Sequence, residues 1–256
     1  MFLIEIDGIK ILYTGDYSRE EERHLKPAEF PDCEVDVLIV ESTYGVAKHE
    51  PRERREQNFT KYVHDIVVNR KGKCLMPVFA LGRAQELLLI LNEYWAEHPE
   101  IAHVPIYHQG NLAKRALDVF NMHRNMMGDK LRMELESGNN PFKFQQYDKL
   151  ETVADSTTPL VIMASPGMLQ NGPSRELFVK WAPFKENGIV FTGYSVEGTL
   201  AKKVMDTHKT IQVGDQVLNR EMSVESISFS AHADYQHTRD YVEILQPPNI
   251  VLVHGD

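Results

Sequence analysis

Short apolar runs that alternate with segments of helical periodicity constrain the fold of this 256-residue chain more than any other sequence feature. Strands separated by helices of roughly 10–15 residues predict βαβ units, a largely parallel sheet and the α/β class. The expected strands lie at 2–6, 9–14, 36–41, 73–78, 104–108, 159–164, 188–193, 222–230 and 249–255. The expected helices lie at about 51–70, 83–97, 111–127, 173–182, 198–206 and 234–245.

Two hairpins are expected to interrupt the parallel pattern. Only Asp7 and Gly8 separate the first two apolar runs, and an Asp-Gly pair between strands favours a type I′ turn. A second hairpin is expected to span 209–230, whereas the turn-rich segment 137–144 fits neither a helix nor a strand pattern. Because a strand stands at each extreme of the chain, we expect the sheet to continue in sequence outside it, and we interpret the chain as a fragment.

Composition and charge restrict the possible partners. No apolar run approaches the roughly 18 residues of a membrane span, so no membrane partner is expected. Cys33 and Cys74 form no C-x-x-C pair, which indicates a reducing compartment and neither a disulfide framework nor a cysteine zinc site. The formal net charge of −9 argues against binding nucleic acid by bulk attraction. RNA binding would therefore depend on bound cations and a few arginines.

Side chains that can bind a metal or transfer a proton follow apolar runs at widely separated positions. Asp16, Glu41 and His254 each end such a run, and His232 follows the run ISFSA. Ligands of open α/β sheets collect beyond the carboxyl ends of the strands, so these residues are expected to share one pocket. Taken singly, a strand-end aspartate is more often a turn residue and a lone histidine more often structural. Asp234 is interpreted as a helix N-cap, not as a catalytic group.

Motifs that extend over nearly the whole chain carry a family resemblance. They are YTGDYSREEERHL (13–25), LIVESTYG (38–45), PVFALGRAQELL (77–88), SPGMLQNGPSRELF (165–178), GYSVEGTLA (193–201), SFSAHADY (228–235) and LVHGD (252–256). In this order they resemble the metallo-β-lactamase/β-CASP nucleases. The resemblance implies an α/β fold: an incomplete metallo-β-lactamase αββα fold at 1–45 and 230–256, with a β-CASP α/β domain inserted at 46–229.

The resemblance also implies roles for the strand-end residues. Asp16 matches the carboxylate that bridges two zinc ions, and His254 matches a zinc-ligating histidine. His232 matches the general acid and Glu41 the acidic residue that holds it, which suits an imidazole with an ordinary pKa near 6.5. The family's upstream His-x-His-x-Asp-His cluster has no counterpart in the chain. Because two zinc ions need about five or six ligand groups, the chain alone is predicted to bind zinc weakly or not at all.

Candidate substrate-binding residues come from the expected β-CASP region. Arg83 starts a helix after Gly82, where amide groups and the helix dipole suit a phosphate, although it can equally pair with nearby carboxylates. Ser165 follows a strand, and Tyr194 could stack on a base. The segment 51–57 is interpreted as a solvated helix face, since glutamates separate its arginines. The apolar segment 87–95 is expected in the core.

The function implied by the resemblance is endonucleolytic cleavage of pre-mRNA at its 3′ end by a zinc enzyme of the nucleus, leaving a 3′-hydroxyl. The implied partners are RNA, a homologous pseudo-nuclease subunit and other 3′-end-processing factors. A non-catalytic β-CASP scaffold subunit, the related Integrator endonuclease and a free-standing nucleotide-binding α/β module remain alternatives. An upstream reading frame that encodes His-x-His-x-Asp-His would favour the enzyme over the scaffold.

Overall fold

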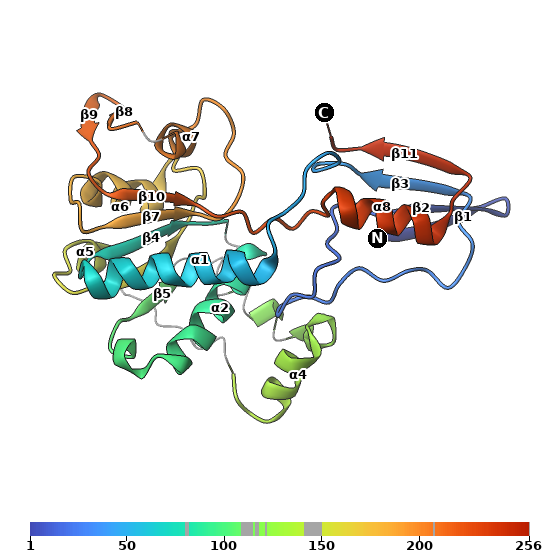
Figure 1. Ribbon diagram of the computed structural model, residues 1–256, viewed down its shortest axis with the longest axis horizontal. Coiled ribbons are helices and arrows are strands. Elements are labelled where there is room, and N and C mark those ends of the chain that lie inside the picture. The colour runs from blue at the N-terminus through green and yellow to red at the C-terminus, as the bar shows by residue number, and fades with distance from the viewer. Residues whose placement is uncertain are drawn as a thin grey trace. The chain divides into compact units, whose positions relative to one another are not determined.

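The chain folds into units with separate sheets. A computed structural model describes residues 1–79, 82–108, 115, 118–120, 122–140, 150–206 and 208–255. The chain divides into two compact units, unit 1 (Met1–Glu50 with Ser230–Asp256) and unit 2 (Pro51–Phe229), whose elements are labelled in Figure 1. Residues 80–81 of one motif, residues 111–114, 116–117 and 121 of the helix expected at 111–127, and positions 141–144 of the turn-rich segment lie outside the described residues.

Unit 1 is built on a mixed sheet in the order β1-β2-β3-β11. Strands β1 and β2 form the predicted antiparallel hairpin, with positive φ angles of 49° at Asp7 and 81° at Gly8, as a type I′ turn requires. Strands β2, β3 and β11 run parallel to one another, so their carboxyl ends lie at the same edge. The strands are β1 (Phe2–Ile6), β2 (Ile9–Tyr13), β3 (Val37–Glu41) and β11 (Asn249–Val253).

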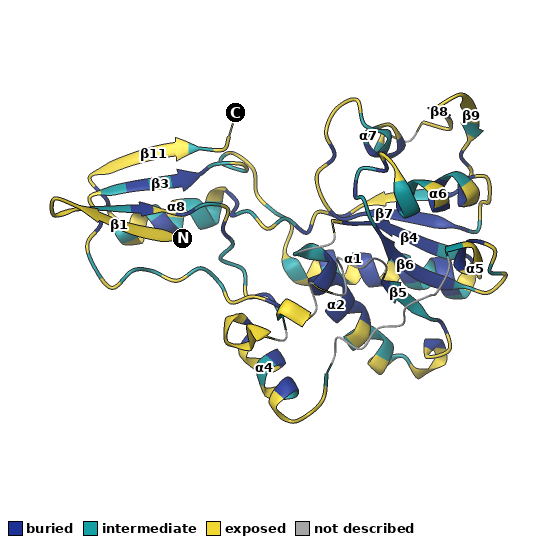
Figure 2. Ribbon diagram, turned by 180° about the vertical axis from the view of Figure 1, so that it is seen from behind, coloured by how far each residue is buried: buried dark blue, intermediate teal, exposed yellow. Residues whose placement is uncertain are grey.

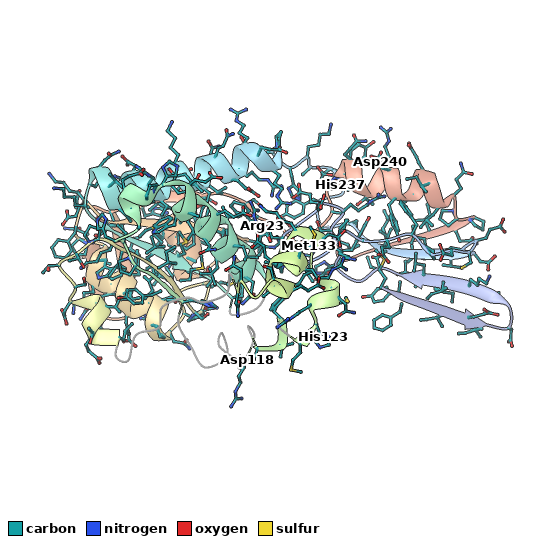
Figure 3. The ribbon with its side chains drawn as sticks, turned by 90° about the horizontal axis from the view of Figure 1, so that it is seen from below. Arg23, Asp118, His123, Met133, His237 and Asp240 are labelled. Carbon is teal, nitrogen blue, oxygen red and sulfur yellow. The ribbon has the colours of Figure 1, made fainter. Side chains whose placement is uncertain are left out.

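The sheet of unit 1 buries one face and exposes apolar side chains on the other. Helix α8 (Tyr235–Leu245) packs through Tyr241 against Leu38 and its neighbours, which form the core of this unit. His237 and Asp240 project from the solvent side of α8 (Figure 3). Strands β1 and β11 are largely exposed in Figure 2 although their side chains are apolar. Little apolar surface is therefore removed from water in unit 1.

Unit 2 contains an all-parallel sheet in the order β10-β7-β4-β6-β5. Its strands are β4 (Lys73–Pro77), β5 (Ile106–His108), β6 (Leu160–Ala164), β7 (Gly188–Phe191) and β10 (Ser223–Ser226). Strand β6 is buried along its entire length, as expected where helices cover both faces of a parallel sheet. The parallel α/β architecture predicted from the sequence is therefore confirmed.

Helices cover both faces of the sheet in unit 2 (Figure 1). One face packs against α1 (Arg52–His64), the π-helical turn Asp65–Asn69 and α2 (Arg83–Glu97). The other face packs against α5 (Leu150–Ala154), α6 (Gly172–Trp181) and α7 (Leu200–Met205). Residues 87–91 of α2 are buried, so the prediction of a core segment is confirmed there. Helix α2 also has the predicted bounds.

The region before Phe229 differs from the sequence-based prediction in its pairing. The hairpin consists of β8 (Thr210–Val213) and β9 (Gln216–Asn219) alone. Strand β10 joins β7 in parallel instead, because its residues 223–226 add to the large sheet. Helices α4 (Asp129–Glu136) and α5 had not been predicted, and no described helix is long and apolar enough to cross a membrane.

Candidate active site

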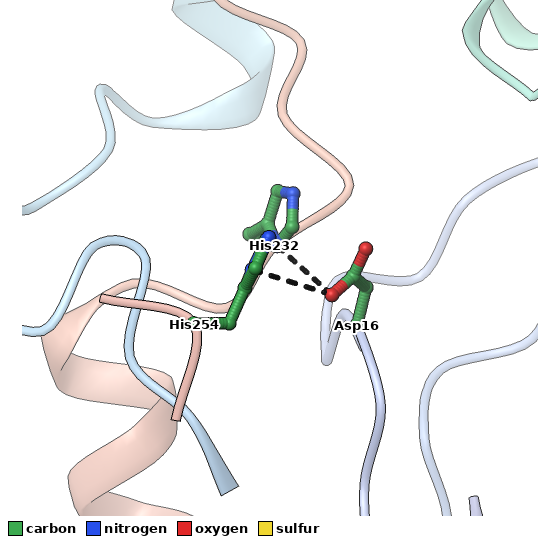
Figure 4. A group of neighbouring side chains, drawn as sticks. All are labelled: Asp16, His232 and His254. Carbon is green, nitrogen blue, oxygen red and sulfur yellow. Dashed lines mark ion pairs between the residues drawn. The ribbon is translucent and has the colours of Figure 1, made fainter. Parts of the chain in front are cut away.

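Three side chains that could bind a metal meet beyond the strand ends of unit 1. Asp16 follows β2, His254 follows β11 directly, and His232 precedes α8. The Oδ1 atom of Asp16 lies 3.5 Å from Nδ1 of His254 and 4.0 Å from Nδ1 of His232 (Figure 4). One ligand atom from each residue lies within 4.8 Å of those of the other two. The parallel course of β2, β3 and β11 produces this convergence, because it brings their carboxyl ends to one edge.

Glu41 forms a hydrogen bond with His232. It ends β3, its side chain is 1% exposed, and its Oε1 lies 3.0 Å from Nδ1 of His232. An ionised carboxylate can only accept hydrogen bonds, so Nδ1 of His232 carries the hydrogen. A second proton on this ring must then bind at Nε2, the nitrogen that points away from Glu41 along the ring. The pair therefore has the arrangement of a buried acid that orients a proton-transferring histidine.

The charge of Glu41 is stabilised despite its burial. Burial by itself would raise the pKa of this carboxyl, but hydrogen bonds from His232 and Thr43 outweigh it and hold the pKa below its ordinary value. The backbone N–H of Thr43 donates to Oε2 at 3.2 Å, and the backbone N–H of Tyr17 donates to Oε1 at 3.4 Å. Glu41 is therefore a carboxylate that can stabilise a positive charge on His232.

Thr43, which no sequence pattern predicted as a site residue, connects the members of the site. Its Oγ1 lies 2.6 Å from Oε2 of Glu41, 2.9 Å from Nδ1 of His254 and 3.2 Å from Nδ1 of His232. The single hydroxyl hydrogen is donated to the carboxylate of Glu41, which cannot donate in return. The oxygen of Thr43 can then accept a hydrogen bond from Nδ1 of His254, which leaves the lone pair of that ring on Nε2.

The backbone after β11 is held in an uncommon conformation. His254 has a φ of 53°, in the left-handed region that costs roughly 1 kcal/mol or more for a residue with a Cβ. A Cβ at Gly255 would lie 2.7 Å from the carbonyl oxygen of Ser42, so only glycine fits against that loop. The backbone N–H of Ser42 donates to the carbonyl of Val253 at 2.8 Å. These contacts fix the position of the His254 ring relative to the end of β3.

The loop that carries His232 is held by Asp234. Asp234 is the N-cap of α8, as predicted, and its Oδ1 accepts from the backbone N–H of His237 at 3.0 Å. Its Oδ2 accepts from the backbone N–H of His49 at 3.0 Å, and Nε2 of His49 lies 3.2 Å from the carbonyl oxygen of His232. Burial would raise the pKa of Asp234, but these two backbone bonds lower it below its ordinary value. One carboxylate thus joins the chain before Pro51 to the chain after Phe229.

The predicted substrate-binding residues lie in unit 2. Helix α2 begins at Arg83 after Gly82, whose φ of 85° suits a glycine. The hydroxyl of Ser165 donates to the carbonyl of Val78 at 2.8 Å, so it helps to hold its own loop. Tyr194 is 70% exposed, which leaves its ring accessible. Their role in binding a substrate stays a prediction.

The arginines of 51–57 differ from one another in their surroundings. Arg52 forms ion pairs with Glu56 at 2.7 Å and Glu86 at 2.8 Å, as the interleaved charges suggested. Arg55 contradicts the prediction of a fully solvated helix face, because it is buried and donates to the carbonyl of Ser228 at 3.0 Å. Its guanidinium also lies 5.8 Å from the ring centre of Phe229. Arg55 therefore contributes to packing.

The donor types at the strand ends fit zinc. Carboxylate oxygens and neutral imidazole nitrogens are common zinc ligands, and a catalytic zinc takes three protein ligands with one position left open. Asp16 and His254 supply two such ligands, since Nδ1 of His232 is held by Glu41. A pair of ions would need about five or six groups. The described residues of unit 1 thus fit one part of a dinuclear centre.

Two family models match the chain. The Beta-Casp domain matches residues 84–204, within unit 2, and the RNA specificity domain of Zn-dependent metallo-hydrolases matches residues 217–256. The second match includes His232, Asp234 and His254. These matches indicate a metallo-β-lactamase fold with a β-CASP insert.

Named relatives match the chain over its full length. It is 54% identical to cleavage and polyadenylation specificity factor subunit 3 of Dictyostelium discoideum and 51% identical to cleavage and polyadenylation specificity factor 73 of Drosophila melanogaster. It is 48% identical to endoribonuclease YSH1 of Saccharomyces cerevisiae. Each similarity covers 100% of this chain but only 33%, 38% and 34% of the respective relative. The chain therefore spans about a third of the length of these relatives.

Proposed function

We propose that this chain, which matches the Beta-Casp domain over residues 84–204 and the RNA specificity domain of Zn-dependent metallo-hydrolases over residues 217–256, forms the proton-transfer side of a zinc-dependent endoribonuclease. The convergence of Asp16, His232 and His254 above buried Glu41 is the observation that supports this proposal. We further propose a metallo-β-lactamase part at 1–45 and 230–256 with a β-CASP domain at 46–229.

The metal-binding role is proposed for Asp16 and His254. Asp16 would offer carboxylate oxygens and His254 a neutral imidazole nitrogen as ligands. When bound, a pair of zinc ions supplies positive charge at the phosphate and activates water for attack. The shortage of ligands among the described residues of unit 1 supports two ions in the complete enzyme only, and weak or no zinc binding at this site in the chain alone.

His232 is proposed as the general acid. A protonated ring would donate from Nε2 to the leaving 3′-oxygen, so that the upstream product ends in a 3′-hydroxyl. Glu41 would hold Nδ1 of the ring at 3.0 Å and favour the protonated form through its negative charge. Thr43 and Asp234 are positioning residues, since the first fixes the carboxylate of Glu41 and the second fixes the loop of His232.

The substrate and setting are proposed from the relatives. Their names refer to cleavage, polyadenylation and endoribonuclease activity, which supports pre-mRNA as the substrate and the nucleus as the location. Arg83, Ser165 and Tyr194 are the proposed RNA contacts on the β-CASP side. A homologous pseudo-nuclease subunit and other 3′-end-processing factors are the proposed partners.

A full-length chimera tests the proposal. This chain would replace the matching segment of the 54% identical Dictyostelium relative, and cleavage of a short RNA would be measured along with zinc content. We expect zinc-dependent cleavage, slowed about 10²–10⁴-fold by His232→Ala with zinc content unchanged. His103→Ala, an exposed histidine of unit 2, is the matched control.

Two outcomes would change the conclusion. A folded, zinc-loaded chimera that cuts no RNA, although the parent relative cuts it, would favour the non-catalytic scaffold. A His232→Ala variant that loses zinc but retains its rate per bound zinc would make His232 a ligand and leave the acid unassigned.

A further inference from the structure

A second group of metal-binding side chains lies in unit 2, with no residue in common with the candidate active site. His64 ends α1, His98 follows the last residue of α2, and Glu100 lies in the 3-10 turn Pro99–Ile101. One ligand atom from each residue lies within 4.8 Å of those of the other two. The carboxyl-terminal ends of α1 and α2 therefore present two imidazoles and one carboxylate together.

Tyr94 holds both histidines of this group. Its hydroxyl lies 3.0 Å from Nδ1 of His64, which places the second ring nitrogen, Nε2, on the far side from Tyr94. Its ring centre lies 4.0 Å from that of His98, and the rings of His64 and His98 lie 5.7 Å apart. A metal-ligating imidazole usually donates its other N–H to an oxygen acceptor, and the hydroxyl oxygen of Tyr94 can take that place when Nδ1 of His64 donates to it.

We propose that His64, His98 and Glu100 bind a zinc-type divalent transition-metal ion. Two histidines, one glutamate and an open fourth position are a recurrent zinc donor set. Solvent reaches the group, since the side chains of His98 and Glu100 are 34% and 57% exposed. An ion bound here would join the end of α1 to the end of α2 through His64 and His98, which lie 34 residues apart in the sequence.

The ligand atoms of His98 and Glu100 lie closer together than two ligands of one zinc ion do. Ligand bonds of about 2.0–2.2 Å around a tetrahedral zinc separate neighbouring ligand atoms by roughly 3.3–3.5 Å. Nδ1 of His98 and Oε1 of Glu100 lie 2.8 Å apart, joined by a hydrogen bond. If the ion takes these atoms, they must separate by roughly half an ångström, and the shared proton leaves to solvent. Torsion of the exposed Glu100 side chain provides that movement.

Metal titration of the 256-residue chain tests the site. The His232→Ala/His254→Ala double variant removes two of the candidate ligands of unit 1 and serves as the background. We expect one equivalent of Zn²⁺ by calorimetry, a four-coordinate Co²⁺ absorption spectrum, and a metal-dependent rise in the unfolding temperature of unit 2. The intrinsic fluorescence of Trp95 and Trp181 reports that rise, because both lie in unit 2.

Single variants in this background assign the ligands. His98→Ala and Glu100→Gln should each weaken Zn²⁺ binding by 10–100-fold or more, by comparison with the roughly 10–100-fold effect of removing an outer-shell partner. Tyr94→Phe should weaken it about tenfold, since it loses only the bond that orients His64. His103→Ala, an exposed histidine three residues beyond Glu100, should bind as the background does.

The proposal is overturned if the double variant shows no saturable Zn²⁺ binding, or if His98→Ala and Glu100→Gln bind as tightly as His103→Ala. Glu100 is exposed, so circular dichroism of Glu100→Gln checks that lost binding does not reflect lost folding. Failure of RNA cleavage by the chimera would leave this result unaffected, because the titration uses neither RNA nor the intact candidate active site.

Discussion

The two sheets of this chain differ in how much of their apolar surface is buried. Every residue of β6 in unit 2 is buried, whereas every residue of β1 in unit 1 is exposed (Figure 2). Unit 2 has helices on both faces of its sheet, and unit 1 packs α8 against one face. Since burial of apolar surface is the main source of stability, unit 2 is expected to be the more stable of the two.

The candidate active site lies in unit 1, the unit whose sheet is less buried. Unit 1 contains the network of Glu41, Thr43, His232 and His254, joined by hydrogen bonds between loops at the strand ends. Polar networks of this kind specify a geometry only when each buried member is satisfied. The structure of unit 1 therefore depends on a few polar contacts, whereas that of unit 2 depends on apolar packing.

The largest predicted effect comes from a matched pair of strand leucines. Leu75 of β4 is 0% exposed and Leu252 of β11 is 65% exposed. Leu75→Ala should lower the free energy of unfolding of unit 2 by about 2–5 kcal/mol, because it leaves a cavity in a packed sheet. Leu252→Ala should change that of unit 1 by no more than about 0.5 kcal/mol.

Different probes separate the two units in this test. Urea unfolding followed by tryptophan fluorescence reports unit 2, and hydrogen exchange of the β3 and α8 amides reports unit 1. If Leu75→Ala and Leu252→Ala lowered the free energy of unfolding equally, β11 would have to bury its outer face in solution. That result would contradict the difference in burial between the two sheets.

The next effect concerns the buried charge of unit 1. Glu41→Gln should destabilise unit 1 by about 1.5–3 kcal/mol, because it removes the acceptor charge from His232 and Thr43. Asp206→Asn, which removes an exposed i,i+4 partner of Lys202 in unit 2, is the control and should cost about 0.5 kcal/mol or less. Hydrogen exchange of the β3 amides measures the first change, and urea unfolding measures the second.

Acid should affect unit 1 through the same carboxylate. The pKa of Glu41 is lower in the folded chain than its ordinary value, so its contribution to stability is present above about pH 4.3 and is lost as the pH falls further through the folded pKa. Glu41→Gln should remove this part of the acid dependence. If the stability of unit 1 in Glu41→Gln still fell as steeply below pH 4.3, other carboxylates would be responsible for the acid dependence.

The sequence predicted those parts of the fold and site that depend on local pattern. Helix α2 follows from the long apolar periodicity of its sequence, and the β1-β2 hairpin follows from Asp7 and Gly8. The convergence of Asp16 with His232 and His254 could be expected because parallel strands end at one edge. Asp234 could be assigned as a cap from its type and its position before a helix.

Contacts between distant parts of the chain could not be predicted in this way. Thr43 contacts His232 and His254 across 189 and 211 residues, so its neighbours in the sequence say nothing about its role. His49 likewise meets the His232 loop across 183 residues. The charge of Arg55 suggests an exposed side chain, yet this side chain is buried and donates to the carbonyl of Ser228, 173 residues away.

Removal of the Thr43 hydroxyl also tests whether unit 1 depends on polar contacts more than unit 2 does. Thr43→Val keeps the shape of the side chain but should destabilise unit 1 by about 1–2 kcal/mol, because Glu41 and His254 each lose a partner. Thr60→Val in α1 of unit 2 removes a hydroxyl that bonds to the carbonyl of Glu56 and should cost about 0.5 kcal/mol or less. In the chimera, Thr43→Val should slow RNA cleavage, and an unchanged rate would contradict its positioning role.

The smallest predicted losses in the free energy of unfolding come from the removal of two helix N-caps. Asp234 caps α8 in unit 1, and Thr199 caps α7 in unit 2 through a bond from the backbone N–H of Lys202 at 3.2 Å. Thr199→Ala should cost about 0.5 kcal/mol and Asp234→Ala about 1 kcal/mol or slightly more. Asp234 also accepts from His49, so its loss frees a second backbone donor.

Asp234→Asn separates the two contributions of this carboxylate. The amide oxygen can still cap α8, but its nitrogen cannot accept from the backbone N–H of His49, so the loop of His232 should loosen while α8 keeps its start. Hydrogen exchange should then quicken at His49 and remain slow at His237. Equal acceleration at both amides would mean that the cap and the loop open as one cooperative element, and the stability of unit 1 would then depend on Asp234 more than on its small apolar core.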